Sequence, residues 1–453
     1  MNNIDVVILA AGKGTRMKST QPKVMHQLAG KPLLDHVIDT ATTLKPKKII
    51  IVVGHEETTI RKHYAQTHLT FVSQKQQLGT GHAVSQASEH LTSAKTLILL
   101  GDVPCIRPDS IKSLTDCPAD VAVLTQILEN PTGYGRIIRG DDGSPCMIAE
   151  EKDANQKEKQ TREINTGIFC VKTPLLKKFL EALTNDNANE EYYLTDIIKY
   201  ASNQGLSIDT VSPSLDFEAK GVNSKQQLAE LEREYQLESA SRLMKAGVTI
   251  LDPMRIDIRG TLTCDSDVSI DVVCIFEGNV RLGKNVSVES HVIIRDSIVK
   301  DNSTIRAFSH VDGASIGSFN DIGPYARIRP GTESQTRVKV GNFVEIKAAT
   351  LDSDAKANHL SYIGDATIGA SVNVGAGTIT CNYDGARKHQ TVIEDNVFIG
   401  SDTQLVAPVT VGAGSTIAAG STITKDVPSG GLALSRTKQT FIADWKRPTK
   451  TTK

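Results

Sequence analysis

The feature that most constrains the fold of this chain is a six-residue repeat in its second half. Apolar residues recur at every sixth position, first at Ile270, Phe276, Leu282, Val288 and Ile294. The period returns at Ile316, Ile322, Ile328, Val340, Ile346, Ile399, Leu405, Val411, Ile417 and Ile423. A six-residue period is typical of a parallel β-helix, in which each face of a triangular coil takes six residues. The second half therefore predicts a β-helix with these side chains in its interior.

The residues around the repeat fit the same fold. A small, charged or polar residue follows each apolar position, as in Asp271, Glu277 and Gly283, and we expect it to allow the tight corner between two faces. Aromatic residues make up only 4% of the chain, with a single Trp. Because a β-helix fills its interior with small aliphatic side chains, this low aromatic content supports the prediction.

The first half has a different pattern, in which strands alternate with helices. Strand-like apolar runs cover residues 6–11, 49–53, 97–100 and 121–125. Helix-like stretches lie between them, such as residues 33–43 and 81–90. This alternation implies βαβ units and an open α/β domain with a mixed or parallel sheet. Ligands of such sheets bind at the carboxyl ends of the strands.

A helix is expected to join the two halves. Ser224 and Gln227 have the spacing of a capping box, and Gly247 is suited to end a helix. We therefore predict an α/β domain over residues 1–225, a linker helix over 226–246 and a β-helix domain over 247–453.

Composition argues against several classes of function. The formal net charge is -1, so no global basic field points to nucleic acid. The seven cysteines form no Cys-X-X-Cys pair, which argues against a disulfide framework or a zinc site. The start of the chain lacks the features of a signal peptide, and no apolar run is long enough to span a bilayer. We expect a cytoplasmic protein that binds neither nucleic acid nor membrane.

A glycine-rich turn follows the first strand, in the stretch IDVVILAAGKGTRM at residues 4–17. Such turns often bind phosphate through their backbone amides. The spacing does not match a Walker P-loop, and Met17 stands where the dinucleotide-binding fingerprint needs its third glycine. From this stretch alone, a phosphate-binding turn and a plain strand-to-helix turn both stay open.

Motifs further along the chain carry a resemblance to a known family. The turn is followed by QPKV and then, in order, by QQLGTGHA, GDVP, PTGYGRI, EEKD, EINTG, EYYLTD and GVN. These motifs resemble the nucleotidyltransferases that make nucleoside-diphosphate sugars. Such a transferase fused to a hexapeptide β-helix resembles the bacterial bifunctional N-acetylglucosamine-1-phosphate uridyltransferase/glucosamine-1-phosphate acetyltransferases. The resemblance runs nearly end to end.

The resemblance implies a left-handed parallel β-helix, a homotrimer and two reactions. The β-helix domain would acetylate glucosamine-1-phosphate with acetyl-CoA. The first domain would transfer UMP from UTP to N-acetylglucosamine-1-phosphate and release pyrophosphate, making a precursor of peptidoglycan and lipopolysaccharide. One alternative is a nucleotide-sugar pyrophosphorylase with a single activity and a structural or regulatory β-helix. Another is a nucleotide-sugar sensor without enzymatic activity.

Uridylyl transfer needs cations and hard oxygen ligands rather than a nucleophile on the enzyme. Arg16 and Lys23 suit the phosphates, and Asp102, at the end of an apolar strand, suits Mg²⁺. The resemblance implies Asn223 as the second metal ligand. It also implies that UTP or UDP-N-acetylglucosamine contacts Leu9, Ala10, Ala11, Gly12, Gly14, Arg16, Lys23, Gln74, Gly79, Thr80, Gly101, Gly135, Glu150, Asn165 and Asn223. The family usually has Tyr where Leu100 stands.

Acetyl transfer needs a base to deprotonate the amine, and histidine is the usual choice near neutral pH. His359 lies in KANHLSYIGDA, a stretch that we interpret as an interruption of the six-residue rhythm between Leu351 and Ile363. Departures from a repeat often mark function, although a histidine in a polar surface loop is the alternative. The resemblance implies that His359 is the catalytic base and that Glu345 helps to orient it.

The resemblance also implies the substrate contacts of the second domain. Glucosamine-1-phosphate would bind Arg329, Lys347, Tyr362 and Asn373. Acetyl-CoA would bind, in a groove between neighbouring subunits, Ala376, Asn382, Tyr383, Lys388, Ser401, Ala419 and Arg436. A basic tail with Lys446, Arg447, Lys450 and Lys453 would reach a neighbour or the CoA phosphates, and a solvated terminus is the alternative.

Overall fold

The computed structural model describes residues 3–450, so Lys453 of the basic tail lies outside the described residues. The chain forms two compact units that divide inside one helix, between Tyr235 and Gln236. All seven cysteines are free thiols. Within residues 3–450, no helix is both long enough and apolar enough to cross a membrane.

The described part of the first unit is built on a sheet with the strand order β11-β7-β10-β6-β1-β4-β5, to which β8 and β9 are attached at β10. The strands are β1 Ile4–Ala10, β4 Lys48–Val53, β5 Thr70–Ser73, β6 Lys95–Leu100, β7 Val121–Ile127, β8 Arg136–Arg139, β9 Pro145–Ala149, β10 Glu163–Lys172 and β11 Ile208–Val211. β1 is parallel to β4 and β6, whereas β10 is antiparallel to β6 and β7. The expected α/β sheet is confirmed, and the four expected strands are present with slightly different ends.

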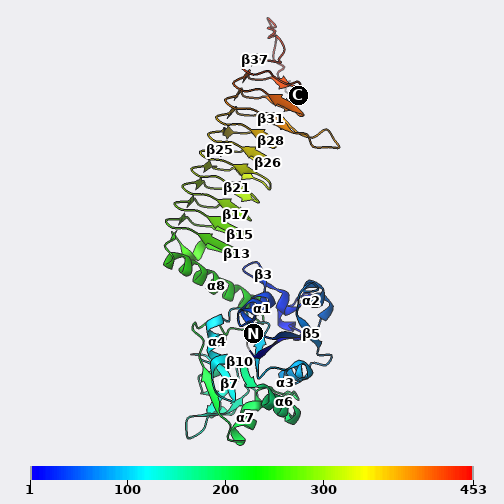
Figure 1. Cartoon of the computed structure of the whole chain (residues 1–453), viewed down its shortest axis with the longest axis vertical. Helices are drawn as coiled ribbons and strands as arrows, with labels where there is room; N and C mark the ends of the chain where they lie inside the picture. Colours follow the sequence, from blue (N-terminus) through cyan, green and yellow to red (C-terminus); the bar gives the residue numbers. More distant parts are fainter. Residues whose placement is uncertain (1–2, 451–453) are drawn as a thin grey trace. The chain divides into compact units, whose positions relative to one another are not determined.

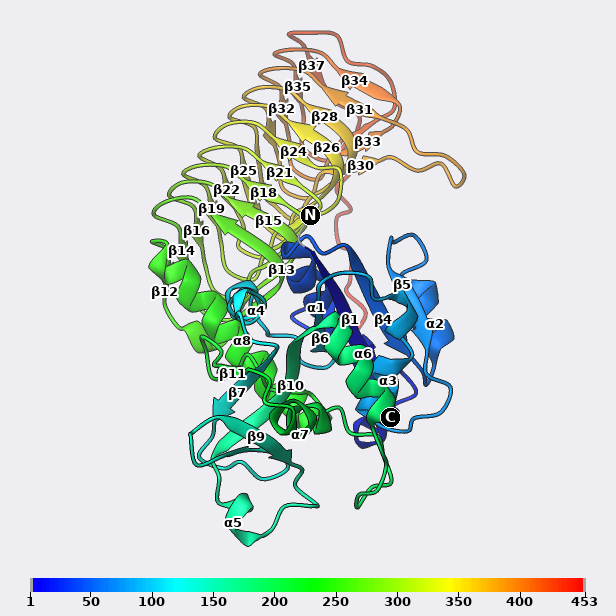
Figure 2. The same cartoon turned by 60° about the horizontal axis from the view of Figure 1, so that its bottom comes forward.

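Helices cover both faces of this sheet (Figure 2). One face packs against α1 Leu33–Thr43, α2 Glu57–His63 and α4 Pro108–Asp116. The other face packs against α3 Thr80–Ser85, α6 Thr173–Ala182 and α7 Asp196–Asn203. Successive residues of β1 alternate between the two cores, because Val6 and Ile8 join the first core and Val7 joins the second.

The two helices expected in this unit have different outcomes. The one expected over residues 33–43 is α1. The stretch expected to be helical over residues 81–90 instead divides into α3 and a 3-10 turn at Ser88–His90. The reason is a tightening of the backbone at Ala87, whose N–H donates to the carbonyl three residues earlier and whose carbonyl accepts from His90.

The parallel register aligns the carboxyl ends of three neighbouring strands. Leu9 of β1 pairs with Leu100 of β6, and Ala10 pairs with Val53 of β4. The Gly101 N–H donates to the Leu9 carbonyl at 2.9 Å, so the turn after β6 begins beside the glycine-rich turn after β1. This is the sheet edge at which ligands of open α/β sheets bind.

Helix α8 spans Lys225–Lys245, and each end lies one residue before that of the predicted linker helix. Ser224 Oγ accepts a hydrogen bond from the Gln227 N–H at 3.1 Å, and the Gln227 side chain accepts one from the Asn223 N–H at 2.8 Å. Gly247 follows the helix with a φ of 101°. Glycine adopts this left-handed conformation without a side-chain penalty, so it ends the helix.

The second unit is a left-handed parallel β-helix whose coils stack in chain order (Figure 1). Each residue of the six-residue repeat named above is buried, with 5% exposure or less. Most coils return to the same register after 17 or 18 residues, as in the pairs Asp321–Lys339 and Lys339–Lys356. The predicted fold class is therefore confirmed.

Nine strands of the β-helix carry or flank the residues expected to act in acetyl transfer. They are β23 Arg327–Ile328, β25 Lys339–Asn342, β26 Glu345–Leu351, β27 Lys356–His359, β28 Tyr362–Ile368, β29 Asn373–Val374, β30 Ile379–Cys381, β32 Phe398–Ile399 and β35 Thr416–Ile417. β25, β27, β29, β32 and β35 lie in one sheet, and β23, β26, β28 and β30 lie in another.

The corners of the coils differ from the prediction. We expected the residue directly after each apolar position to make the turn. The structure instead places left-handed backbone three residues after Ile270 and Leu282, at Val273 and Asn285, with φ values of 60° and 55°. The reason is that the strand pairing continues beyond the apolar residue, since the Asp271 N–H still donates to the next coil. The chain can turn only after that bond.

The six-residue rhythm is not interrupted at KANHLSYIGDA, contrary to our expectation. Ala357 takes the interior position between Leu351 and Ile363 and has no exposed surface. It pairs with Val340 of the preceding coil. The pattern of large aliphatic residues missed this position because a methyl group fills it. His359 therefore lies on a regular coil, and an interruption of the repeat no longer supports a functional role for it.

One corner of successive coils carries stacked, exposed rings, which we call the aromatic column: His291, Phe308, Tyr325 and Phe343. Adjacent ring centroids in the aromatic column are 4.7, 4.9 and 5.3 Å apart. Leu360 occupies the same corner on the next coil, and Phe343 and Leu360 are 58% and 62% exposed. A continuous exposed apolar surface of this kind is typical of a protein contact.

Replacing Ile322 by Ala tests the interior of the β-helix. Ile322 is fully buried in β22 Asp321–Ile322 and pairs with Ile305 and Val340. Because the substitution leaves a cavity, we expect the free energy of unfolding to fall by about 3 kcal/mol, measured by urea unfolding of the full chain. The control is Ile298→Ala, whose side chain is 46% exposed and whose loss should stay below about 1 kcal/mol. Equal losses would contradict the interior assignment.

Candidate active sites

A cavity of about 300 Å³ lies at the carboxyl ends of β1 and β6. Nine residues expected to bind UTP or the metal line it: Leu9, Ala10, Ala11, Gly12, Lys23, Gln74, Gly79, Thr80 and Asp102. The other residues of its lining are Val24, Gln77, Ala83, Leu100 and Glu191. The fold therefore gathers segments that are far apart in the sequence around one cavity.

Lys23 can pack against the glycine-rich turn because Gly14 has no side chain. Gly14 has a φ of +58°, and a Cβ there would lie 2.7 Å from the Cβ of Lys23. At Gly12, in contrast, a Cβ would meet no atom within 4 Å. Arg16 is exposed and lies outside the cavity lining. Of the two expected cations, Lys23 is therefore the one that the fold places in the cavity.

Lys23 joins the two expected metal ligands. Its Nζ donates to Oδ2 of Asp102 and, at 3.1 Å, to Oδ1 of Asn223. The side chains of Lys23 and Asp102 are only 15% and 17% exposed. Two oxygens that converge on one cationic group also suit a divalent cation. No cluster of three or more His, Cys, Asp or Glu side chains suited to a metal occurs in residues 3–450, so water and phosphate would complete the shell of a cation here.

Gln74 is buried, and two contacts hold its amide. Nε2 donates to the Gly79 carbonyl and to Nδ1 of His82, both at 3.0 Å. Because these contacts use both N–H groups, the amide oxygen is the group that Gln74 offers to a ligand. His82 was absent from the expected set, although it belongs to the QQLGTGHA motif.

The EYYLTD motif supports the QQLGTGHA motif directly. Gly79 has a φ of +106°, and a Cβ there would lie 2.6 Å from the Tyr192 carbonyl. The Gly81 N–H donates to the same carbonyl at 2.8 Å, and Thr80 Oγ1 accepts from the Leu194 N–H at 3.2 Å. These close contacts require glycine and carry the neighbouring Glu191 to the cavity.

The residues expected to bind the sugar form a second group beside the cavity. The Asn165 N–H donates to the Gly135 carbonyl at 2.8 Å, and a Cβ at Gly135 would lie 3.4 Å from Oε2 of Glu150. Burial raises the pKa of Glu150, and nearby carboxylates, including Glu191 of the cavity lining, raise it further. A hydrogen bond of 2.9 Å from Thr195 opposes this shift. The carboxylate of Glu150, one of the residues expected to bind the sugar, therefore lies close enough to the cavity to interact electrostatically with Glu191 of its lining.

Leu100, which stands where the family usually has Tyr, lines the cavity. A Cβ at Gly167 would lie 2.6 Å from Cδ1 of Leu100, so this leucine packs directly on the backbone of β10. The carboxylate of Asp102 still reaches Lys23. The departure from the family pattern therefore leaves the expected metal ligand in place.

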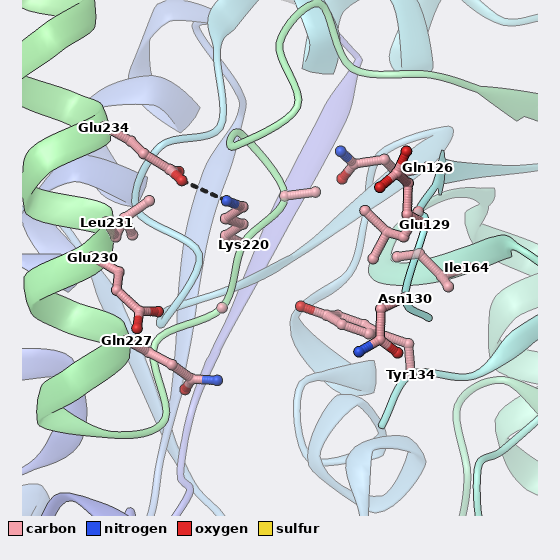
Figure 3. Close-up of a pocket in the computed structure, with 13 residues that line it drawn as sticks. Gln126, Glu129, Asn130, Tyr134, Ile164, Lys220, Gln227, Glu230, Leu231 and Glu234 are labelled. Carbon is pink, nitrogen blue, oxygen red and sulfur yellow. Dashed lines mark hydrogen bonds and ion pairs between the residues drawn. The ribbon is translucent and has the colours of Figure 1, made fainter. Parts of the chain in front are cut away.

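A second cavity, of about 290 Å³, lies in the same unit (Figure 3). Its polar walls are rich in carboxylates, including Glu129, Glu230 and Glu234, and Figure 3 shows the 2.6 Å ion pair between Lys220 and Glu234. Its described lining contains none of the residues expected to bind UTP, sugar or metal. Of these two cavities, only the first is therefore lined by residues expected to bind the nucleotide.

His359 and Asn342 are paired on adjacent coils of the second unit. They lie in register on β27 and β25, and Nδ1 of His359 is 3.0 Å from Oδ1 of Asn342. Because the amide oxygen accepts, Nδ1 carries the proton and Nε2 is the basic nitrogen. Asn342 was absent from the expected set, because it lies 17 residues before the histidine, where no local motif signals it.

Glu345 does not orient His359, contrary to our expectation. Its Oε1 accepts from Nη1 of Arg329 at 2.7 Å, and its Oε2 lies 3.8 Å from Nη1 of Arg327. The register explains this arrangement, because Glu345 on β26 pairs with Arg327 on β23, whereas β27 of His359 belongs to the other sheet. The Glu345 carboxylate therefore positions Arg329, an expected phosphate-binding residue.

The expected phosphate-binding residues lie across one corner from His359. The chain turns at Leu360, between the end of β27 at His359 and the start of β28 at Tyr362. Lys347 lies on β26, which pairs with β28, and Arg329 directly follows β23, which pairs with β26. A cationic face therefore adjoins the histidine.

A column of small residues continues from His359 along this edge. Ala376, Ser401 and Ala419 each directly precede a corner residue with positive φ, as His359 precedes Leu360. Backbone bonds of 2.7 and 2.8 Å connect Ala376 and Ser401 to the corner residues of the following coils. Three expected acetyl-CoA contacts therefore share a column with the expected base.

A projecting loop after β30 carries other expected acetyl-CoA contacts (Figure 1). Asn382 is buried at its base, with Nδ2 3.4 Å from the hydroxyl of Tyr362. Lys388 Nζ lies 4.7 Å from the ring centre of Tyr383, a cation–π distance. The loop thus begins beside Tyr362, which is expected to bind the sugar, and projects from the β-helix.

The remaining expected contacts are more dispersed. Arg436 donates to the Ala419 carbonyl at 3.0 Å, which joins it to the column of small residues. Asn373 lies on β29 and pairs with Lys356, on the strand that ends at His359. The structure therefore places Asn373 on the next coil of the same sheet, three residues before the column.

Both units of the chain are similar to known protein families. Residues 6–142 match the family model of the MobA-like NTP transferase domain. Residues 390–425 match that of the bacterial transferase hexapeptide (six repeats), and residues 258–334 match that of the GMPPB C-terminal domain.

Full-length relatives cover both units. The chain is 52% identical to Bifunctional protein GlmU of Ralstonia nicotianae, 55% identical to that of Nitrosomonas europaea and 53% identical to that of Burkholderia multivorans. Each match covers 99% of this chain and 99% of the relative. The similarity therefore spans both candidate sites.

Replacing Gly14 by Ala tests the close packing of Lys23 against the glycine-rich turn. The added Cβ would collide with Lys23, so we expect the affinity for UTP, measured by calorimetry, to fall at least about tenfold. The control is Gly205→Ala, which has a similar φ of +65° but no atom within 4 Å of the new Cβ. It bears the same backbone strain, about 1 kcal/mol, and should keep its UTP affinity. Equal losses of affinity would contradict the role of this contact.

Proposed function

This chain belongs to the family of bifunctional GlmU proteins, and from that premise we propose which of its residues carry out each reaction. It is a two-reaction enzyme of UDP-N-acetylglucosamine synthesis. Its β-helix domain acetylates glucosamine-1-phosphate with acetyl-CoA. Its nucleotidyltransferase domain transfers UMP from UTP to N-acetylglucosamine-1-phosphate and releases pyrophosphate. The observation that carries this conclusion is the identity to such relatives over nearly the whole chain.

We propose the same three domain ranges that the sequence predicts. The uridylyltransferase domain takes residues 1–225, the linker takes 226–246 and the acetyltransferase domain takes 247–453. The position of helix α8, Lys225–Lys245, supports this division.

In the proposed uridylyl transfer, a phosphate oxygen of N-acetylglucosamine-1-phosphate attacks the α-phosphorus of UTP, and the bond to pyrophosphate breaks. Backbone amides of residues 12–14 cradle the phosphates. Lys23 and Arg16 neutralise the phosphate charge, with Lys23 already in the cavity and Arg16 on the adjoining turn. The enzyme thus aligns two phosphates and needs no nucleophile of its own.

We propose that Asp102 and Asn223 hold Mg²⁺. The support is geometric, because both oxygens converge on the ammonium of Lys23 in this structure. When bound, the ion would neutralise the charge that develops on the phosphates. Lys23, once released by the two ligands, would turn its ammonium to the phosphates.

We propose that the uracil base of UTP binds beside Gln74 in the cavity and that the sugar binds the neighbouring residues Gly135, Glu150 and Asn165. The amide oxygen of Gln74 would accept the N–H of uracil, beside Gly79 and Thr80. Glu150 and Asn165 would bind hydroxyls of the sugar, with Gly135 allowing its close approach. Leu9, Ala10, Ala11 and Gly101 would complete the nucleotide site at the strand ends.

In the proposed acetyl transfer, the amine of glucosamine-1-phosphate attacks the acetyl carbonyl while Nε2 of His359 takes a proton from the amine nitrogen. The C–S bond then breaks, and the protonated His359 returns that proton to the sulfur, so that CoA leaves as the thiol. Asn342 holds the opposite nitrogen, which keeps Nε2 basic. Arg329 and Lys347 would bind the phosphate, and Tyr362 and Asn373 would bind the sugar.

Acetyl-CoA is proposed to lie along the column of small residues, where side chains leave room for a narrow pantetheine arm. Its contacts would be Ala376, Asn382, Tyr383, Lys388, Ser401, Ala419 and Arg436. We further propose a homotrimer whose subunits meet near the column of small residues, so that acetyl-CoA lies in a groove between them. The exposed aromatic column supports such a subunit contact. The seven free thiols fit a reducing compartment, and we propose that the enzyme works in the cytoplasm.

A pair of variants tests the assignment of the two reactions. The assay supplies glucosamine-1-phosphate, acetyl-CoA, UTP and Mg²⁺, and follows free thiol and pyrophosphate separately. Asp102→Asn should lower pyrophosphate release at least about 100-fold, because the charged metal ligand is lost, and should leave thiol release unchanged. His359→Ala should lower thiol release at least about 100-fold. With N-acetylglucosamine-1-phosphate supplied, it should release pyrophosphate normally.

The same assay can refute these roles. Normal thiol release by His359→Ala would reject the base assignment, and normal pyrophosphate release by Asp102→Asn would reject the metal ligand. A wild-type protein that releases pyrophosphate when N-acetylglucosamine-1-phosphate is supplied, but releases no thiol from acetyl-CoA and glucosamine-1-phosphate, would be a pyrophosphorylase with a structural β-helix.

Replacing Asn342 by Ala tests the orientation of the base. Without the amide oxygen, the ring of His359 is free to rotate and either nitrogen can carry the proton, so we expect thiol release to fall about tenfold. The control is Asn279→Ala, an exposed asparagine of the same β-helix, which should keep full activity. An unchanged rate in Asn342→Ala would reject the positioning role.

A further inference from the structure

Glu218 is a buried carboxyl group that neither proposed reaction uses directly. It lies between β11 and α8 and has no exposed surface. Its Oε2 accepts from Oγ of Ser110 at 2.6 Å and from the Arg107 N–H at 3.2 Å, and its Oε1 accepts from the Leu215 N–H at 2.9 Å. Burying such a group costs free energy unless it is hydrogen-bonded, so the three donors explain how it is tolerated.

Two of the three partners of Glu218, Arg107 and Ser110, lie on the segment that follows Asp102. Arg107 precedes α4, and Ser110 lies in the first turn of that helix. Glu218 itself lies shortly before Asn223 in the sequence. The carboxyl group therefore joins the two segments that carry the proposed metal ligands.

Ser110 strengthens this junction. Its side chain is buried, with 2% exposure, and its Oγ also accepts from the Ser214 N–H at 3.2 Å. One hydroxyl thus donates to Glu218 and accepts from the loop that leads to it. The loop before Glu218 is consequently tied to α4 at two points.

Further bonds continue the connection to the ligands themselves. The Val222 N–H donates to the Asp102 carbonyl at 2.9 Å, and Val222 has no exposed surface. The Asn223 N–H donates to the side chain of Gln227 at 2.8 Å, in the first turn of α8. The segment is therefore held at its start by Glu218 and at its end by Gln227.

We propose that Glu218 is a positioning residue for the metal site, which fixes the separation of Asp102 and Asn223 and so sets the affinity of the uridylyltransferase for a divalent cation. This inference rests on the proposed assignment of those two residues as metal ligands. Groups behind metal ligands influence affinity because they orient the ligands before the cation binds. Their loss typically lowers affinity by about 10- to 100-fold.

A purely structural role is the competing explanation, and Asp5 provides a matched control for it. Asp5 is also a fully buried carboxyl group, and it accepts from the N–H groups of Thr92 and Ser93 at 2.6 and 2.8 Å. It lies near the start of β1, at the end of the strand opposite to the cavity. Asp5→Asn therefore disturbs a comparable group of the same unit without touching the ligand segments.

The experiment compares Glu218→Gln with Asp5→Asn in the full chain. It measures the Mg²⁺ concentration for half-maximal pyrophosphate release, the binding of Mn²⁺ alone by electron paramagnetic resonance, and hydrogen exchange at the Val222 amide. For Glu218→Gln we expect a Mg²⁺ requirement about tenfold higher, weaker Mn²⁺ binding and faster exchange. For Asp5→Asn we expect all three unchanged. Thiol release should stay normal in both variants and report an intact second unit.

Two outcomes overturn the proposal: equal changes in both variants, or no change in the Mg²⁺ requirement of Glu218→Gln. If Glu218→Gln does not fold, Ser110→Ala removes the 2.6 Å contact with Glu218 together with the 3.2 Å bond from the Ser214 N–H, so it loosens the same junction and should raise the Mg²⁺ requirement by about threefold. An unchanged requirement in Ser110→Ala would then reject the role.

Asp102→Asn separates this inference from the function on which it rests. If that variant still binds Mn²⁺ normally, the metal assignment itself is wrong. If it loses Mn²⁺ binding while Glu218→Gln keeps it, only the positioning role is wrong.

Discussion

In-register pairing of parallel strands is the constraint on which both active sites depend. In the first unit, Leu9 pairs with Leu100, so the turns after β1 and β6 meet at one edge of the sheet. In the second unit, Asn342 pairs with His359 one coil later. Interior side chains enforce both registers, because a shift by one residue would turn the apolar residues of the β-helix outward and would exchange the residues of the two cores in the first unit. Distant parts of the sequence thereby become neighbours with little freedom to separate.

The apolar period was sufficient to predict the β-helix because it reports directly which side chains fill the interior. It does not report the backbone between those positions. The corner falls at Val273 because Asp271 is still bonded to the next coil, which no side-chain pattern reveals. Ala357 was missed because its methyl group occupies an interior position that elsewhere holds a larger aliphatic residue.

Predicted binding residues are brought together in space, but the groups that orient them were not predictable. His82 acts on Gln74, and Asn342 acts on His359, through single contacts of 3.0 Å whose partners the motifs do not specify. Glu345 shows the converse, because it lies only three residues after Asn342 in the sequence, yet its carboxylate pairs with Arg329. Ion pairing across strands, rather than proximity along the chain, decides such roles.

The contact of Lys23 with Asp102 and Asn223 has a consequence for how the first site would bind metal and nucleotide. The ammonium serves as an internal counter-ion, so the carboxylate of Asp102 is neutralised before any substrate arrives. In the proposed metal site, a divalent cation that takes these oxygens would displace the ammonium, and the incoming phosphates would supply that ammonium with a new partner. Binding is then an exchange of ionic partners, which favours the joint arrival of metal and nucleotide over either alone.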